Sequence, residues 1–138
     1  MSVDILKAVR AFLLADSTIT AEVSTRVFAL ELPKAEAESM PRKCVVLSLA
    51  GGSEPRDYVR RTWLRLDVWN YGLTPIQTMD VQRVTHYALK ELARTKQGDT
   101  LLHNAAQSSG PRYFKTPDED WPVTIESWMV LASEVTAV

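Results

Sequence analysis

The 138-residue sequence lacks most of the features that assign a protein to a functional class at first sight. It has one cysteine, Cys44, so it forms no disulfide within the chain. No apolar run approaches the roughly 20 residues needed to cross a bilayer. Sixteen Lys and Arg residues nearly balance seventeen Asp and Glu residues, and the formal net charge is −1. So small an imbalance excludes a strong overall attraction to nucleic acid or to an anionic membrane.

The amino-terminal residues do not have the pattern of an export signal. Asp4, Lys7 and Arg10 interrupt the apolar positions there, whereas a signal peptide has an uninterrupted apolar stretch. We therefore expect the protein to stay soluble in the compartment where it is made.

Recognisable catalytic and metal-binding motifs are also missing. Cys44 lies in an apolar run, which predicts a buried and unreactive thiol. His86 and His103 have no metal-site partners at ligand spacing, and the acidic run Asp118–Asp120 lacks the alternating ligands and glycine of a calcium loop. Gly51-Gly52-Ser53 is not followed by the Lys-Ser/Thr pair of a phosphate-binding loop. We predict no cofactor, no metal and no enzymatic activity; an active site built from dispersed residues is the alternative.

The composition is that of a single globular domain. Hydrophobic residues make up 46% of the chain and charged residues 24%, which is typical of a folded protein. A chain of this length buries roughly two-thirds of its unfolded surface without help from disulfides or metals. We therefore expect one domain over residues 1–138.

Two stretches predict the main helices. The first runs from about Val3 to Ala15 and carries apolar residues at helical spacing. The second opens with Thr74 as N-cap and Pro75 at the first helical position, and it is expected to end near Gly98. The buried stripe predicted for this second helix consists of Val81, Val84, Ala88 and Leu92, flanked by Ile76, Tyr87 and Leu89.

Alternating and apolar runs predict a sheet. The predicted strands are Arg26–Leu30, Lys43–Leu49, Arg60–Tyr71 and Val123–Val135, with 101–107 and 112–115 as either two short strands or one irregular edge. Lys43–Leu49 is apolar on both faces and should lie inside the sheet. Gly51–Arg61 should form a long protruding hairpin, and Lys34–Pro41 an exposed connection. The predicted fold class is α+β, a mostly antiparallel β-sheet with two main helices packed on one face.

The strand Arg60–Tyr71 has two differently marked faces. Side chains alternate along a strand, so Leu64, Leu66 and Val68 form one face, which is expected to face the core. The opposite face mixes large aromatic residues with charges, as the anchors of protein interfaces do. Trp128 in the last strand is likewise predicted to lie opposite the stronger core face. The predicted subunit-interface residues are Trp63, Arg65, Asp67, Trp69, Tyr71 and Trp128.

Two explanations of this aromatic face stay open at this point. The tryptophans are either covered by the chain's own loops or buried against a neighbouring subunit. Two main helices cover one face of a sheet well and leave little chain for the other. Because bare tryptophans would form a large adhesive patch, the second explanation predicts association.

A basic cluster marks the hairpin. It consists of Arg56, Arg60 and Arg61, with Arg42 and Lys43 expected to be adjacent across the hairpin. Its positive charge is too sparse for strong counterion release from DNA. The cluster is either an ordinary solvated hairpin or a contact loop, and a contact with protein is favoured over one with nucleic acid.

Several segments occur together in a recognisable order and spacing. They are Val3–Asp16, Arg26–Phe28, Thr62–Tyr71 leading into the helix Ile76–Leu92, and Phe114–Ser133 with its Pro117-Asp118 turn. In this pattern nearly the whole chain resembles the tail-completion, or tail-terminator, proteins of long-tailed bacteriophages and related prophages. The resemblance rests on patterning and not on catalytic residues.

The resemblance implies a structural virion protein. Such proteins form a ring, commonly a hexamer, that caps the finished tail tube and provides the surface to which the head connector docks. DNA passes through the lumen of the ring without sequence-specific binding. The implied partners are further copies of the chain, the tail tube protein and the head connector or neck protein, with no membrane partner. The implied location is the tail–neck junction of the virion, after synthesis in the host cytoplasm.

The resemblance also gives the basic cluster a candidate role, and two other functions stay open as alternatives to it. Arg56, Arg60 and Arg61 become candidates for contact with the tail tube or the connector. The alternative function is a small ligand-binding or regulatory α+β domain, which a metabolite would stabilise. An enzyme with dispersed catalytic groups is a third hypothesis.

Overall fold

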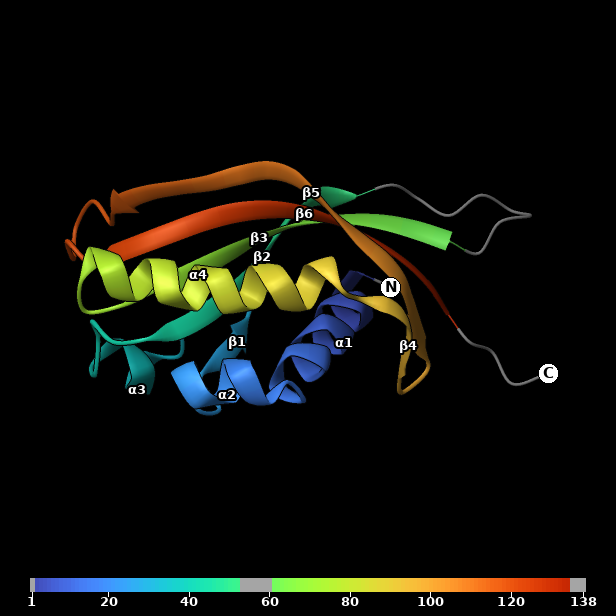
Figure 1. Ribbon diagram of the computed structural model, residues 1–138, viewed down its shortest axis with the longest axis horizontal. Helices are drawn as coiled ribbons and strands as arrows, with labels where there is room; N and C mark the ends of the chain where they lie inside the picture. The colour runs from blue at the N-terminus through green and yellow to red at the C-terminus, as the bar shows by residue number, and fades with distance from the viewer. Residues whose placement is uncertain (1, 53–60, 135–138) are drawn as a thin grey trace.

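The computed structural model describes residues 2–52 and 61–134 (Figure 1). Its helices are α1 (Ser2–Leu14), α2 (Ser17–Val23), α3 (Lys34–Ala37) and α4 (Pro75–Lys90). Its strands are β1 (Val27–Ala29), β2 (Cys44–Gly52), β3 (Arg61–Tyr71), β4 (Ala93–Gln97), β5 (Thr100–Lys115) and β6 (Pro122–Glu134). The tip of the predicted protruding hairpin, with Arg56 and Arg60, lies outside the described residues.

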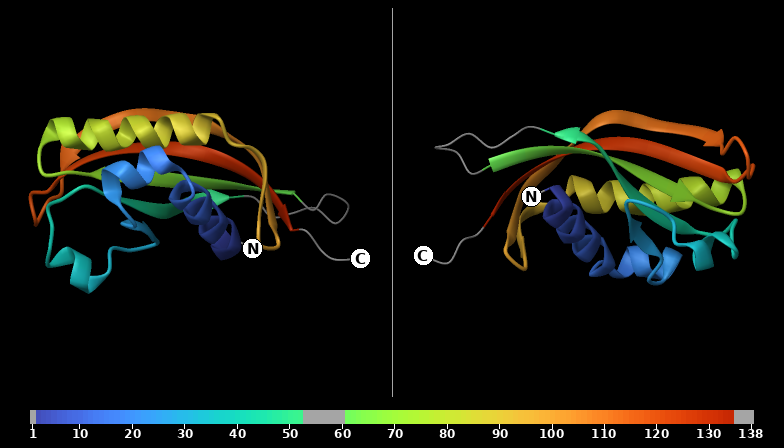
Figure 2. Two further views of the ribbon diagram at one scale, coloured as in Figure 1. Left: turned by 60° about the horizontal axis from the view of Figure 1, so that its bottom comes forward. Right: turned by 180° about the vertical axis from the view of Figure 1, so that it is seen from behind.

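The strands form one sheet in the order β1-β2-β3-β6-β5-β4. Within the described chain, β1 and β2 run parallel and the other neighbouring pairs run antiparallel. Helices α1, α2 and α4 lie together on one side of the sheet (Figure 1, Figure 2). The predicted α+β class and the interior position of the second strand are therefore confirmed.

The main hydrophobic core fills the space between these three helices and the sheet. Leu64, Leu66 and Val68 of β3 are buried in it, as predicted. The helix residues that pack there are Ile5, Leu6, Val9 and Leu13 of α1, Ile19 and Val23 of α2, and Val81, Ala88 and Leu89 of α4. Burying one large aliphatic side chain stabilises a fold by about 1.5–3 kcal/mol, so this cluster fixes the helix layer on the sheet.

The capping residues place the start of α4. The Thr74 hydroxyl accepts a hydrogen bond from the Gln77 amide at 3.3 Å, and Pro75 occupies the first turn. The Gln77 side-chain oxygen accepts a second hydrogen bond from the Leu73 amide at 3.0 Å. Both local bonds form between residues close in sequence, which is why this boundary could be predicted.

The end of α4 differs from the prediction. The helix stops at Lys90, and Ala93–Gln97 forms β4, which pairs antiparallel with β5. The polar residues of β4 lack the apolar alternation of a half-buried strand, so the segment gave no strand signal. Gly98 has a φ of +62° and lies between β4 and β5, where left-handed backbone favours glycine. This glycine therefore belongs to a hairpin turn and not to the end of the helix.

The buried side of α4 is also more polar than predicted. Val81, Ala88 and Leu92 are buried as expected, but Ile76 and Tyr87, predicted to flank them, are exposed. Buried threonines of α4 occupy positions on the sheet side instead.

A hydrogen-bonded network explains why α4 turns its threonines, and not Ile76 and Tyr87, toward the sheet. The Thr85 hydroxyl donates to Asn70 Oδ1 at 2.9 Å, and the Asn70 amide donates to the Thr124 carbonyl at 3.1 Å. The hydroxyls of Thr78 and Thr124 lie 2.8 Å apart. All four residues are buried, and a buried polar group without a partner costs about 1–3 kcal/mol. The network therefore favours one orientation of α4 over β3 and β6.

Strand β5 is one irregular strand, which was one of the two predicted alternatives. Register shifts against β6 between Gln107 and Ser109 and between Ser109 and Arg112 mark bulges that absorb Gly110 and Pro111. Strand β4 pairs with β5 only as far as Asn104. The bulges and the proline interrupt the outer edge beyond that point, which disfavours pairing with a further strand.

The close contact at Gly72 leads to a stability prediction. A Cβ atom at this position would lie 2.8 Å from Gln77 Cβ and from the Thr78 nitrogen. We expect Gly72→Ala to lower the free energy of unfolding by about 1–3 kcal/mol, measured by urea denaturation, because the start of α4 must shift. Gly110→Ala is the matched control, since a Cβ there meets nothing within 4 Å, and it should change stability by less than about 0.5 kcal/mol. Equal effects of the two substitutions would contradict the packing described here.

Candidate functional site

The face of β3 opposite the main core is the candidate site. Residues paired across neighbouring strands share one face of the sheet. Along β3 and β6, the pairs on this face are Trp63–Leu131, Arg65–Met129, Asp67–Ser127, Trp69–Ile125 and Tyr71–Val123. The half of this face that contains Tyr71 differs from the half that contains Trp63, because among the described residues a hydrophobic cluster covers the first half and not the second.

A second hydrophobic cluster covers the Tyr71 half. Its buried members are Cys44, Val46, Tyr71, Val123 and Ile125, and its partly buried members are Phe28, Leu32, Met40, Trp69, Phe114 and Trp121. The Trp69 ring stacks on Tyr71 with centroids 6.4 Å apart and meets Phe114 edge-on at 5.9 Å. Tyr71 in turn meets Trp121 at 6.3 Å. The chain's own loops thus cover this half, as the first of the two explanations requires.

The segment between β1 and β2 is largely exposed, as predicted, at Lys34, Ala35, Glu38 and Ser39, but it also provides part of this cover. Leu32 and Met40, which flank α3, pack against the second cluster. Glu36 of α3 is buried and accepts hydrogen bonds from both Arg42 Nε at 2.7 Å and Arg42 Nη2 at 2.5 Å. This paired contact closes the segment on itself, and sequence spacing alone gave no sign of it.

The Trp63 half of the face is open. In the described chain the second cluster ends at Trp69 and Ile125, and beyond it Trp63 and Arg65 are exposed. The Trp63 side chain is 38% exposed. We call the set Trp63, Arg65, Asp67, Met129 and Leu131 the open face. Asp67, Met129 and Leu131 are partly buried. The face therefore presents apolar surface beside a cation and an anion.

Polar contacts hold the boundary between the two halves. The Ser127 hydroxyl of β6 donates to Asp67 Oδ1, and the Trp69 indole N–H donates to Ser48 Oγ of β2 at 2.9 Å. These bonds join three neighbouring strands and fix the directions of Asp67 and Trp69. The open face is consequently built on the rigid centre of the sheet.

Trp128 does not lie on this face, and its predicted orientation is wrong. It pairs with Leu66 on the helix side of the sheet and is 2% exposed. Its ring lies 5.4 Å from the His86 ring of α4. Strand β6 carries apolar residues on both faces, so alternation alone did not identify the side that the helices cover. Tyr71 is also buried, whereas Trp63 and Arg65 occupy the open face.

The basic cluster is only partly described. Arg56 and Arg60 lie outside the described residues, and Arg61 begins β3. Arg42 and Lys43 precede the end of β2 that pairs with Tyr71, whereas Arg61 lies at the opposite end of β3. Each forms an ion pair of its own, Arg42 with Glu36 and Lys43 with Glu22 at 2.7 Å. The predicted adjacency of these two residues is therefore wrong for Arg61, and for Arg56 and Arg60 it falls outside the described residues.

The cysteine and histidine considered as catalytic or metal-binding groups lie in ordinary packing or hydrogen-bonding environments. Cys44 is buried, as predicted, and this burial raises the pKa of its thiol to about 12. Among the described residues, no three His, Cys, Asp or Glu side chains gather closely enough to hold a metal ion. His103 Nε2 lies 2.8 Å from Ser133 Oγ. No helix in the described part of the chain is long and apolar enough to cross a membrane.

A second buried acid, besides Glu36, was not anticipated from the sequence. Glu126 of β6 is fully buried on the helix side, where its Oε2 accepts hydrogen bonds from Gln82 at 2.9 Å and Gln107 at 3.2 Å. His86 Nδ1 lies 3.3 Å from the same oxygen. The sequence signal was available, since Glu126 shares a strand face with Trp128 and would have been recognised once that face was known to be the core.

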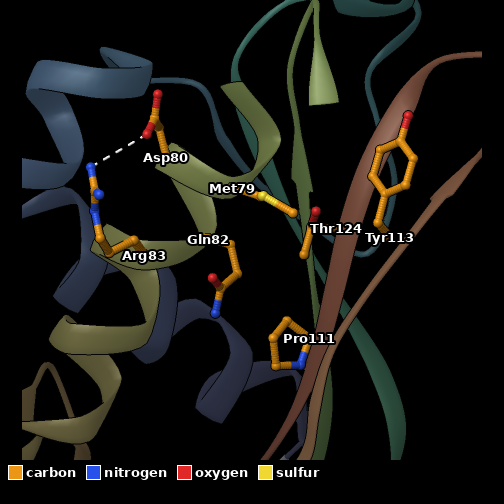
Figure 3. Close-up of a pocket in the computed structure, with 7 residues that line it drawn as sticks. All are labelled: Met79, Asp80, Gln82, Arg83, Pro111, Tyr113 and Thr124. Atoms are coloured by element: carbon orange, nitrogen blue, oxygen red, sulfur yellow. Dashed lines mark hydrogen bonds and ion pairs between the residues drawn. The ribbon is translucent and has the colours of Figure 1, made fainter. Parts of the chain in front are cut away.

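A cavity of about 360 Å³ lies between α4 and β5 (Figure 3). The α4 residues that line it are Met79, Asp80, Gln82 and Arg83, and the strand residues are Pro111, Tyr113 and Thr124. Sequence patterning gave no sign of it, because its walls come from segments about thirty to forty positions apart.

The two raised pKa values predict a loss of stability in alkali. Burial raises the pKa of Tyr71 to about 12, with smaller contributions from Cys44 and Glu119. The unfolded chain releases these protons at roughly pH 8.5 for Cys and 10 for Tyr, so their stabilisation is complete below those values and is lost as the pH rises toward 12. We expect the free energy of unfolding in urea to fall over this range.

Tyr71→Phe should make this fall shallower above roughly pH 10, because it removes one of the two proton-binding groups. Tyr87→Phe, at an exposed tyrosine, is the matched control and should leave the slope as in the wild type. Identical slopes for Tyr71→Phe and the wild type would rule out burial of the Tyr71 hydroxyl as the cause.

Comparison with known proteins identifies a shared fold. No family model and no curated protein matches the sequence. Among solved structures, the chain is similar to one in the structure described as "Virion of native gene transfer agent (GTA) particle". The two are 13% identical, the match covers 94% of each chain, and the TM-score is 0.67. At this identity the likeness shows that the chain has the fold of a protein found in a gene transfer agent virion.

Proposed function

We propose that this protein is a structural, non-enzymatic virion component that caps a bacteriophage tail tube as a ring and forms the tail side of the head–tail joint. The observation that carries the proposal is the open face. The chain covers half of this sheet face with its own loops and leaves Trp63 and Arg65 exposed on the other half. An exposed apolar surface on an otherwise well-packed domain is typical of a protein contact site.

Two independent likenesses support the virion role. The order of segments along the sequence resembles the tail-terminator proteins, and the fold matches a chain in a gene transfer agent virion over 94% of its length. The absence of a charge imbalance agrees with a ring through which DNA passes without sequence-specific contacts. The partners in this proposal are further copies of the chain, the tail tube protein and the head connector protein, at the tail–neck junction of the virion.

A ring requires a particular kind of contact. Identical subunits close into a ring when two different surfaces of each subunit meet and the rotation between neighbours closes, as in the hexamer proposed here. The open face would be one of these two surfaces, and its mixture of a tryptophan, an arginine and apolar side chains suits an interface anchor.

Native mass spectrometry and negative-stain electron microscopy test the proposal. The purified protein is examined alone and with tail tubes of the same phage. We expect ring particles of one closed subunit number, bound at one end of the tube. A protein that stays monomeric at all concentrations, with or without tubes, would rule the proposal out.

Two tryptophans on the same face of β3 allow a matched comparison. Trp69 belongs to the second cluster, so Trp69→Ala should lower the free energy of unfolding of the monomer by about 3 kcal/mol. Trp63 is 38% exposed and lies outside the second cluster, so Trp63→Ala should cost the monomer less than Trp69→Ala does but prevent or weaken ring formation. Urea denaturation measures the first effect and native mass spectrometry the second. Intact rings formed by Trp63→Ala would exclude the open face as the contact.

A further inference from the structure

We propose that the second ring surface is the exposed side of α4 around the cavity, and that the open face of a second copy docks there with Trp63 in the cavity. This inference rests on the ring proposed above, because only a closed ring of identical subunits requires two different contact surfaces on each one. It names which surface of the neighbour the open face meets.

The start of α4 carries an unusual amount of exposed apolar surface. Ile76 and Met79 are 72% and 55% exposed, and Leu73 just before the helix is exposed as well. Tyr113 of β5 stands at the same place on the other side of the cavity. Among the described residues, eight large hydrophobic side chains are exposed, and these are four of them. We call Leu73, Ile76, Met79 and Tyr113 the α4 patch.

The patch does not serve the protein's own core. The network of Asn70, Thr78, Thr85 and Thr124 holds the opposite side of α4 against the sheet, so the side with Ile76 and Met79 points outward. Exposed apolar groups gathered in one place on a soluble domain mark a contact site more often than scattered ones do.

The cavity within the patch suits an aromatic side chain. Its volume of about 360 Å³ leaves room for an indole, and Figure 3 shows Met79, Pro111 and Tyr113 around it. Methionine sulfur and a tyrosine ring both make favourable contacts with an inserted aromatic group. Trp63 is the exposed tryptophan of the open face and therefore the anchor that fits this cavity.

The docking of Trp63 in the cavity also brings together opposite charges, Arg65 of the open face and Asp80 of α4. Asp80 lines the cavity and pairs with Arg83 at 3.3 Å, and the two side chains are 34% and 64% exposed. A surface pair of this kind contributes little, so the Asp80 carboxylate can accept a further donor. Arg65 lies two positions from Trp63 on the same face of β3, about 7 Å along the strand. With Trp63 in the cavity, the Arg65 guanidinium comes within reach of Asp80 and sets the register of the contact.

A mixing experiment tests this pairing. Trp63→Glu places a charge in the open face, and Met79→Glu places one in the α4 patch. Both positions are exposed, so both variants should fold. Under conditions in which the wild type forms rings, each variant alone should be monomeric by native mass spectrometry. An equimolar mixture should form heterodimers and nothing larger. The intact open face of Met79→Glu binds the intact α4 patch of Trp63→Glu, and the remaining two surfaces of the dimer are both disrupted.

The dissociation constant of the wild-type contact supplies a second measurement. Each substitution should raise the dissociation constant of the contact by a factor on the order of 30, which is the loss expected at an interface hot spot. Tyr87→Glu is the matched control on the same helix, exposed but outside the cavity lining, and should leave rings intact. Charge reversal gives an independent check, since Arg65→Asp should weaken rings and Arg65→Asp with Asp80→Arg should restore them.

The outcomes separate this inference from the function on which it rests. Rings formed normally by Met79→Glu would overturn the α4 contact and leave the ring function standing. Dimers of Met79→Glu alone would mean that two open faces meet each other, which also overturns it. A wild-type protein that forms no ring would contradict the proposed function, and this inference would fail together with it. A mixture that stays monomeric, when circular dichroism shows both variants folded, contradicts the pairing directly.

Discussion

The antiparallel pairing of β3 with β6 is the constraint on which the rest of the structure depends. It runs without interruption from Arg61–Ser133 to Tyr71–Val123. Because side chains alternate along a strand, a shift of one residue would move Leu64, Leu66 and Val68 out of the core and place Trp63 and Arg65 inside it. The same register that builds the core thus also builds the open face. Any account of what the protein contacts begins from these paired residues.

The layers on the two sides of the sheet are unequal, and the surface follows from this. Three helices cover the side with the main core, while the segment around α3, together with Phe114 and Trp121, covers half of the other side. On the other half, within the part of the chain that the structure describes, Trp63 and Arg65 are exposed. On the helix side, the polar network around Asn70 fixes α4 with Ile76 and Met79 outward. Two separate apolar surfaces therefore result from one packing arrangement, and the proposed ring requires two different contact surfaces on each subunit.

Features with local signals could be predicted from the sequence. The alternation in β3 gave its core face, and Thr74 with Pro75 gave the start of α4, because strand alternation and helix caps involve residues close in sequence. Features that depend on distant packing could not. Strand β6 is apolar on both faces, so the side of Trp128 was assigned wrongly, and β4 was missed because its edge position requires no apolar pattern. The cover over Trp69 depends on where Leu32 and Met40 fold, and the cavity depends on the meeting of α4 with β5.

The central claim is that the open face joins neighbouring subunits of a ring at the end of the tail tube. A cryo-electron microscopy reconstruction of the assembled tail end, with side chains visible, tests it most directly. The account predicts a closed ring of this chain in which Trp63 of each subunit is buried against the next. A ring in which Trp63 faces solvent, or a tail end that lacks this chain, would contradict it.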